Sequence, residues 1–164
     1  MSMGPFEYAR RVEQRREKMY RLAYCYVKNE QDALDIVGES VCRGLIRLGQ
    51  LRKQEQFEPW LNRIVINTAL DFLRWKKRHP TCWDEEVPEI SYEEDGLSAD
   101  ERIDLYEMLD RLQPEERTYI ILRFFEERSF KEMAEILQLP ETTVKSRIYR
   151  LLAKLQKLQQ EVTE

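Results

Sequence analysis

The segment from residue 80 to 101 constrains the architecture most, because it interrupts an otherwise helical chain. It contains nine acidic residues and no basic residue, together with two prolines and a glycine, and its apolar residues follow no regular period. Such a composition favours an extended, solvated chain over packed structure. We therefore expect two domains, 1–79 and 102–164, joined by an acidic flexible linker at 80–101. The alternative, a long acidic loop inside one domain, is uncommon in compact proteins.

Helical periodicity runs through both segments that flank this linker. Apolar residues recur at spacings of three and four, and the 164 residues include only 5 glycines and 6 prolines, too few for a turn-dense β architecture. We predict helices over about 12–28, 29–49 and 57–77 in the first domain. In the second we predict four, over about 103–112 and starting near 114, 130 and 141. The predicted fold class is all-α: two small helical domains, the second a four-helix domain with a helix-turn-helix.

The apolar positions of these helices form the expected cores. The second helix should bury Leu34, Val37, Val41, Leu45 and Leu48. Gly38 and Gly44 lie inside that helix, and each should cost it about 1 kcal/mol relative to alanine. A stripe along the third helix turns from apolar to polar towards its basic end, and consists of Trp60, Ile64, Asn67, Asp71 and Arg74. The second domain should bury residues 119–122, Phe124, Phe125, Phe130, Met133, Ala134 and Leu137.

The net charge of −4 is an average over three unlike segments. Residues 1–79 hold 16 basic and 10 acidic residues, the linker carries −9, and residues 102–164 hold 11 basic and 12 acidic residues. Within the last segment, residues 142–160 contain five basic residues and no acidic one. Mild overall acidity therefore does not exclude a nucleic-acid partner.

A helix-turn-helix is the motif that carries function. Ser129 and Glu132 form a predicted capping box, the helix that follows breaks at 138–140, and the acid-free helix begins at once. Its inner face should consist of Val144, Ile148, Leu151, Leu152, Leu155 and Leu158. The outward residues of its first half can contact phosphates and base edges, and they are Thr143, Lys145, Ser146, Arg147, Tyr149 and Arg150. A solvated basic face on the last helix of a bundle is the alternative.

Several function classes are disfavoured by composition. The chain has no apolar run long enough to span a membrane, and its charged N-terminus does not resemble a secretory signal. Three widely spaced cysteines indicate free thiols and a cytoplasmic location. His79 and Cys82 are too few ligands for a metal site, so we expect no metal and no cofactor. With one histidine and no nucleophile–base pair, we expect no enzyme and no small-molecule substrate.

The chain resembles bacterial RNA polymerase sigma factors of the extracytoplasmic function (ECF) group in the sigma-70 family. In the second domain the resemblance rests on LQPEER at 112–117, LRFFEERSFKEMAEIL at 122–137 and LPETTVKSRIYR at 139–150. In the first it rests on DALDIVGE at 32–39 and FEPWLNRIVIN at 57–67, followed by Asp71 and Arg74. It covers about 15–78 and 103–158, in order. Gly38 departs from the family, which usually has glutamine there, and Cys42 stands where an aromatic residue is common.

The resemblance implies roles for three groups of residues. The first domain should bind core RNA polymerase through one side of its second helix, at Asp32, Asp35, Glu39 and Arg43. It should read and melt the minus-ten promoter element through Asn67, Asp71, Arg74, Trp75, Lys76, Lys77 and Arg78. Trp75 could stack on a base or pack in the core, and Trp83 is the other aromatic candidate. In the second domain, the minus-thirty-five element should be read by Lys145, Ser146, Tyr149 and Arg150, with Arg123, Thr143 and Arg147 on phosphates.

The implied partners are core RNA polymerase, promoter DNA and an anti-sigma factor, which in the family is often anchored in the membrane. The acidic linker would thread the channel through which RNA leaves the polymerase, or would be only a solvated connection. Two rival functions use the same residues. A stand-alone helix-turn-helix regulator would bind specific duplex DNA without polymerase, and a helical adaptor would show no salt-dependent DNA binding.

Overall fold

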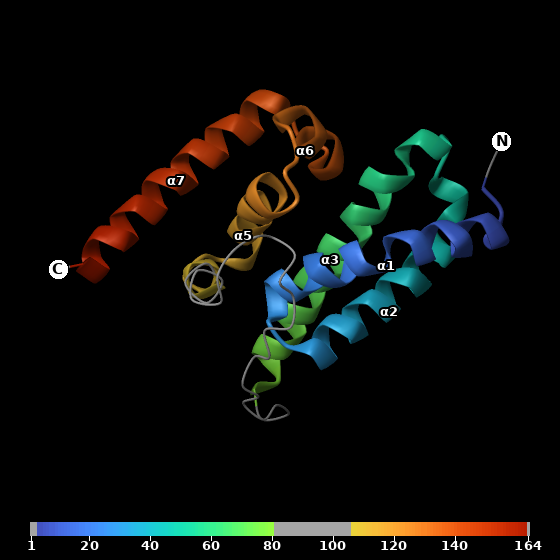
Figure 1. Cartoon of the computed structure of the whole chain (residues 1–164), viewed down its shortest axis with the longest axis horizontal. Helices are drawn as coiled ribbons and strands as arrows, with labels where there is room; N and C mark the ends of the chain where they lie inside the picture. The colour runs from blue at the N-terminus through green and yellow to red at the C-terminus, as the bar shows by residue number, and fades with distance from the viewer. Residues whose placement is uncertain (1–2, 81–105, 164) are drawn as a thin grey trace. The chain divides into compact units, whose positions relative to one another are not determined.

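The computed structural model describes residues 3–80 and 106–163, with the side chains of 159 and 161–163 excepted. Its residues divide into two compact units, one within 1–99 and one within 100–164 (Figure 1). Every regular element in the described ranges is a helix, which confirms the all-α fold class. Apart from Pro80, the predicted linker at 80–101 lies outside the described residues, as do Cys82 and Trp83.

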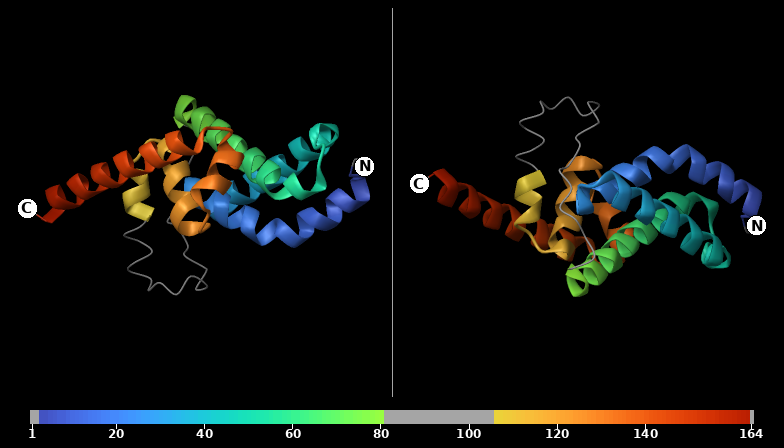
Figure 2. Two further views of the ribbon diagram at one scale, coloured as in Figure 1. Left: turned by 90° about the horizontal axis from the view of Figure 1, so that it is seen from above. Right: turned by 90° about the horizontal axis from the view of Figure 1, so that it is seen from below.

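The first unit is a bundle of three long helices, α1 (Pro5–Val27), α2 (Glu30–Ile46) and α3 (Phe57–Arg78). Each contacts the other two, and the three lie together as one bundle in which α1 crosses α3 (Figures 1 and 2). Two short 3-10 turns, η1 (Leu48–Gln50) and η2 (Gln54–Gln56), connect α2 to α3. Asn29 caps α2 as predicted, because its side chain accepts a hydrogen bond from the amide of Asp32 at 2.9 Å.

Tyr8 is buried near one end of this bundle, where α1 and α3 begin and α2 ends, and it explains one of the two helical glycines. Its ring meets Phe57 and Trp60 edge-on, and its hydroxyl donates to the carbonyl of Val41 at 2.7 Å. A Cβ placed on Gly44 would lie 2.2 Å from Tyr8 Oη, so only glycine leaves room for the phenol. Burial, with a smaller contribution from Cys42, raises the pKa of Tyr8 to about 12.

The predicted core of α2 is correct only in part. Val37 and Leu48 are buried and Val41 is half-buried, but Leu34 and Leu45 are each 49% exposed, so their predicted burial is wrong. The helix also ends at Ile46 rather than near Gly49. The reason is that the buried side of α2, which packs against α1 and α3, includes four residues that the predicted apolar stripe left out: Ala33, Ile36, Ser40 and Gly44. Small and polar residues let the helices approach closely, and they turn the two leucines outwards.

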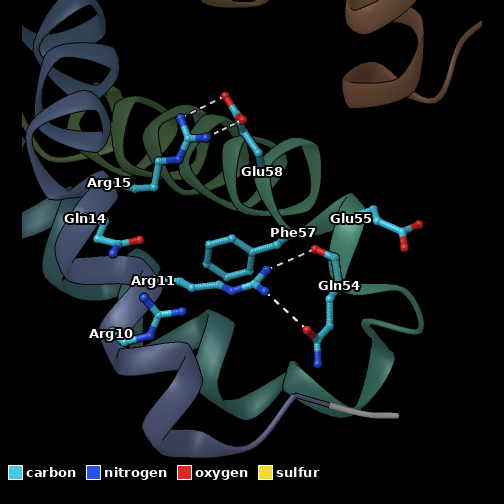
Figure 3. Close-up of a pocket in the computed structure, with 8 residues that line it drawn as sticks. All are labelled: Arg10, Arg11, Gln14, Arg15, Gln54, Glu55, Phe57 and Glu58. Carbon is cyan, nitrogen blue, oxygen red and sulfur yellow. Dashed lines mark hydrogen bonds and ion pairs between the residues drawn. The ribbon is translucent and has the colours of Figure 1, made fainter.

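Arginines of α1 tie it to the start of α3. Arg11 donates to the carbonyl and side-chain oxygens of Gln54 at 3.1 and 3.2 Å, and its guanidinium lies 5.7 Å from the centre of the Phe57 ring (Figure 3). Arg15 binds Glu58 through both of its terminal nitrogens (Figure 3). These contacts fix the end of α3 that lies opposite the basic end.

The second unit consists of helical residues 106–110, α5 (Pro114–Ile120), the π-helical turn η4 (Ile121–Phe125), α6 (Phe130–Leu137) and α7 (Glu141–Thr163). Its core contains Leu109, Leu112, Ile121, Leu122, Met133, Ile136, Val144, Ile148 and Leu151. Phe124 is 53% exposed and Leu152 37% exposed, so their predicted burial is wrong. On α6, Met133 is buried as predicted, but Phe130, Ala134 and Leu137 are only half-buried and Ile136 takes the second core position.

Candidate nucleic-acid interface

Local capping interactions define both ends of α6, the first helix of the helix-turn-helix. The Ser129 side chain accepts from the amide of Glu132 at 3.1 Å, and Glu132 accepts from the amide of Ser129 at 3.0 Å, which is the predicted capping box. At the other end Gln138 adopts a left-handed conformation (φ 56°), and the amide of Leu139 donates to the carbonyl of Ala134 at 3.1 Å. Pro140 follows at once, and α7 begins at Glu141.

The four residues predicted to reach base edges from the outward face of α7 are exposed, as predicted. Val144, Ile148 and Leu151 are buried, and this orientation leaves Lys145, Ser146, Tyr149 and Arg150 exposed along the opposite side. Tyr149 is 63% exposed. The four residues predicted to reach base edges therefore share one accessible face.

An aromatic ring on α6 brings three of the predicted DNA-binding residues together. The Arg123 guanidinium lies 4.4 Å from the centre of the Phe130 ring, Lys145 Nζ lies 5.7 Å from it, and the Tyr149 ring centre lies 6.4 Å away. Arg123 also donates to the carbonyl of Arg128 at 2.9 Å. We refer to Arg123, Phe130, Lys145 and Tyr149 as the Phe130 cluster. No sequence pattern indicates this cluster, because the periodicity predicts that Phe130 lies in the core.

Arg147 and Thr143 lie away from this cluster. The Arg147 guanidinium is 5.7 Å from the centre of the Tyr119 ring on α5 and donates to the Tyr119 hydroxyl. Thr143 is half-buried. A second bond between the same helices joins Lys154 to Glu116, at 2.9 and 3.1 Å. Burial raises the pKa of Glu116, but Lys154 and the amide of Gln113 outweigh it and leave that pKa below its ordinary value.

In the first unit the predicted minus-ten residues extend along the basic end of α3. Asn67, Asp71, Arg74, Trp75, Lys77 and Arg78 are exposed, and Lys76 is half-buried. Asp71 is shared by two arginines, since it accepts from Arg43 at 2.8 Å and from Arg74 at 3.2 Å. Trp75 is 40% exposed and stacks on His79 with ring centres 4.5 Å apart, so the alternative of core packing is wrong for Trp75, whereas Trp60 is buried as predicted.

The predicted polymerase-binding residues do not share one exposed side of α2. Asp35 and Glu39 are exposed, but only 1% of the Asp32 side chain is, and it pairs with Lys76 of α3 at 3.3 Å. Asp32 therefore does not lie on the exposed side with Asp35 and Glu39, and its contact with polymerase stays a prediction. The physical reason is that α3 brings a cation to the start of α2, which stabilises the buried carboxylate. Arg43 is half-buried and binds two exposed carboxylates, Glu39 on its own helix and Asp71 on α3.

A groove between α1 and α2 was not predicted. Tyr20, Leu34, Val37, Gly38 and Val41 form its floor, and its rim is charged, with Glu13, Arg16, Glu17 and Glu30. A Cβ on Gly38 would meet no heavy atom within 4 Å, so this glycine opens the groove rather than making room for a neighbour. The signal that could have found it is Leu34, an apolar residue one position outside the helix's packed stripe.

Two kinds of feature are absent from the described part of the chain. Residues 3–80 and 106–163 contain no group of three or more histidine, cysteine, aspartate or glutamate side chains placed to hold a metal ion. None of the helices described has the length and apolar character needed to cross a membrane.

Two helical units, the second with an exposed basic recognition helix, define a DNA-binding protein, and comparison with known families makes this specific. The family model for sigma-70 region 2 matches residues 11–79, and that for sigma-70 region 4 matches 102–155. RNA polymerase sigma factor SigV of Bacillus subtilis is 42% identical over 144 residues, 88% of this chain and 85% of that protein. ECF RNA polymerase sigma factor SigW of the same organism is 31% identical over 149 residues, 82% and 79% of the two chains.

Two solved structures show the same fold. The structure of CnrH with the cytosolic domain of CnrY has a TM-score of 0.70 at 22% identity, over 96% of this chain and 90% of that one. The sigma factor RpoE of Bartonella quintana, with the anti-sigma factor NepR, has a TM-score of 0.73 at 20% identity, over 94% and 97%.

The chain belongs to the sigma-70 family and, within it, to the ECF sigma factors. It is an alternative sigma factor that directs promoter-specific transcription, a regulatory initiation factor rather than a stand-alone regulator.

Proposed function

We propose that this sigma factor recruits core RNA polymerase through α2 and reads the promoter through α3 and α7. The observation that carries the proposal is the row of Lys145, Ser146, Tyr149 and Arg150 along the exposed side of a capped helix-turn-helix. Hydrogen-bonding and cationic side chains in the first half of a recognition helix are those that reach base edges. They would read the minus-thirty-five element in the major groove, within the domain predicted at 102–164.

Phosphate contacts would come from the flanks of this face. Arg147 points to the α5 side, and Arg123 lies on the other side, against α6. Thr143 stands near the start of the helix. Such flanking contacts fix the register of a recognition helix and do not read sequence.

The minus-ten element would be read and opened at the basic end of α3, in the domain predicted at 1–79. Asn67, Asp71 and Arg74 present polar groups along one side, and Lys76, Lys77 and Arg78 would follow the phosphate backbone. Trp75, exposed and already stacked on His79, offers a platform for an unpaired base, a contact worth about 1–3 kcal/mol.

The polymerase would dock on the exposed side of α2. Asp35 and Glu39 supply negative charge, Arg43 stands beside them, and Leu34 with Gly38 adds an apolar groove. A charged rim around a small apolar floor is the usual anatomy of a protein interface. The predicted acidic linker at 80–101 would thread the RNA exit channel.

An anti-sigma factor is the further partner that we propose. RpoE is bound to an anti-sigma factor in its solved structure, and CnrH is bound to the cytosolic domain of CnrY. We also propose that the protein works in the cytoplasm, where the polymerase acts on DNA, that an anti-sigma factor can hold it at the membrane, and that it needs no cofactor and catalyses no reaction.

Run-off transcription with core polymerase and a promoter library tests these roles. We expect initiation at one class of promoter, and Arg150→Ala should cost about 1–3 kcal/mol and relax specificity at one position of the minus-thirty-five element. Lys157→Ala is the matched control, because it removes one exposed positive charge from α7 outside the recognition half. If both proteins are active and no specific initiation occurs, the proposal is wrong. If Arg150→Ala weakens binding to random DNA equally, Arg150 is a phosphate contact.

A further inference from the structure

The Phe130 cluster joins three DNA-facing side chains through a residue that no role has yet been given. Arg123 comes from η4, whereas Lys145 and Tyr149 come from successive turns of α7, and all three contact the one ring. Phe130 is only half-buried, so its ring covers little of the core and instead presents an aromatic face to these side chains.

The backbone that carries the ring is held by the helix cap. Phe130 is the first residue of α6, directly after the Ser129 cap, and Arg128 on the other side of the cap donates to Glu132 at 3.2 Å. The carbonyl of Arg128 accepts from Arg123, so the guanidinium is anchored to the same short segment that carries the ring. The capped start of α6 therefore positions the backbone of Phe130 and one of its cationic partners together.

Long cationic side chains lose conformational freedom when they bind a target, and contacts that restrict them beforehand reduce that loss. An aromatic face attracts cations without satisfying their hydrogen-bond donors. Arg123 gives one donor to the carbonyl of Arg128 and Lys145 Nζ lies 3.6 Å from Glu141, which leaves further donors on each side chain for DNA. Tyr149 packs on the same ring while 63% of the residue stays exposed.

We propose that Phe130 is a positioning residue for promoter recognition, whose ring sets Arg123, Lys145 and Tyr149 in their binding geometry before DNA arrives. This inference rests on the proposed reading of the minus-thirty-five element by α7. Removing the ring leaves all three side chains in the protein. The general attraction to phosphates therefore remains, and the discrimination between DNA sequences falls.

Phe130→Leu and Phe130→Tyr in the full chain, assembled with core polymerase, test this. The probes are a promoter selected by the wild-type protein and the same promoter with its minus-thirty-five element scrambled, at one salt concentration. We expect Phe130→Leu to lower the ratio of the two affinities roughly five- to tenfold, with affinity for the scrambled DNA unchanged. Phe130→Tyr, which keeps the ring, should retain the wild-type ratio.

A control variant on the same helix separates a loss of stability from a loss of DNA discrimination. Ile136→Val trims a buried side chain of α6 and should lower the unfolding midpoint without changing the affinity ratio. If Phe130→Leu does not fold, Phe130→Met, an unbranched apolar side chain without a ring, replaces it with the same expected loss. An unchanged ratio in the folded ringless variant overturns the inference.

A double-mutant cycle asks whether Phe130 acts through its partners. In a Lys145→Ala background the loss caused by Phe130→Leu should shrink, because one of the side chains that the ring positions is gone. If the two substitutions instead lower the affinity ratio by independent factors, Phe130 acts on DNA without Lys145, which contradicts a positioning role. If Lys145→Ala lowers the ratio and Phe130→Leu does not, only this inference fails. If the wild-type protein shows no preference for the minus-thirty-five element, the proposed function fails with it.

Discussion

Individual residues in the first unit carry roles that their residue type does not reveal. Gly38 and Gly44 occupy the same helix, six positions apart, and both were expected to weaken it. Only Gly44 is required by packing, because the hydroxyl of Tyr8 fills the space a side chain would take. Gly38 faces open space and lines the groove that we propose as part of the polymerase contact.

This difference predicts opposite effects of alanine at the two sites. Gly44→Ala should lower the free energy of unfolding by about 1–3 kcal/mol, because Tyr8 must shift and lose its bond to Val41. Gly38→Ala should raise it by about 0.5–1 kcal/mol, since the helix gains propensity without a clash. Urea denaturation of the full chain measures both. Tyr8→Phe in the Gly44→Ala background should recover part of the loss, and equal effects of the two alanines would contradict this account.

Between elements, a partly buried ion pair joins the start of α2 to the basic end of α3. Asp32 is almost fully buried, and Lys76, which is 36% exposed, reaches it from the last turn of α3. Lys76 therefore holds the basic end of α3 against the bundle, whereas its neighbour Lys77 is exposed.

Lys76→Ala should lower the free energy of unfolding by about 1–3 kcal/mol, because the buried carboxylate loses its cationic partner. Lys77→Ala, which removes the same charge one residue later, should change it by less than about 0.5 kcal/mol. Thermal unfolding of both variants makes the comparison. Equal losses would show that the Asp32–Lys76 pair contributes nothing specific.

The capping box is the contact that starts α6. Ser129→Ala should cost about 1 kcal/mol of stability, because the amide of Glu132 loses its acceptor. The amide of Ser129 lowers the pKa of Glu132 below its ordinary 4.5, so this stabilisation is present above pH 4.5 and is lost as the pH falls below it. The carboxylate of Glu132 carries this pH dependence, so wild-type protein and Glu132→Ala should differ less in free energy of unfolding at pH 3 than at pH 7. Ser146→Ala, an exposed serine inside α7, serves as control and should cost nothing.

At the scale of the whole molecule, the two candidate DNA surfaces belong to separate compact units. Substitutions that share no contacts normally have additive free energies. We therefore predict that Asn67→Ala and Arg150→Ala weaken binding of the holoenzyme to its promoter independently. The double variant should show the sum of the single losses within about 0.5 kcal/mol. A coupling above about 1 kcal/mol would mean that one unit senses the other on the promoter.

The sequence alone determined the features that short segments specify. Helix period, the Ser129–Glu132 cap, the break before Pro140 and the acid-free helix are local signals, and they predicted the all-α fold and the exposed face of α7. The family motifs, read in order along the chain, predicted the sigma-factor assignment.

Only the tertiary structure decided which residues at the edges of each helix's apolar stripe are buried by a neighbouring helix. Periodicity gives the direction of the apolar stripe, but a residue at its edge is buried or exposed according to what packs beside it. Asp32 is buried because α3 brings Lys76 to it, whereas Leu34 lies outside the side of α2 that packs in the bundle. Arg147 bonds Tyr119, and Phe130 gathers Arg123 and Lys145, since α5 and α6 meet α7 at these points. Such contacts join residues up to 44 positions apart, and no local pattern encodes them.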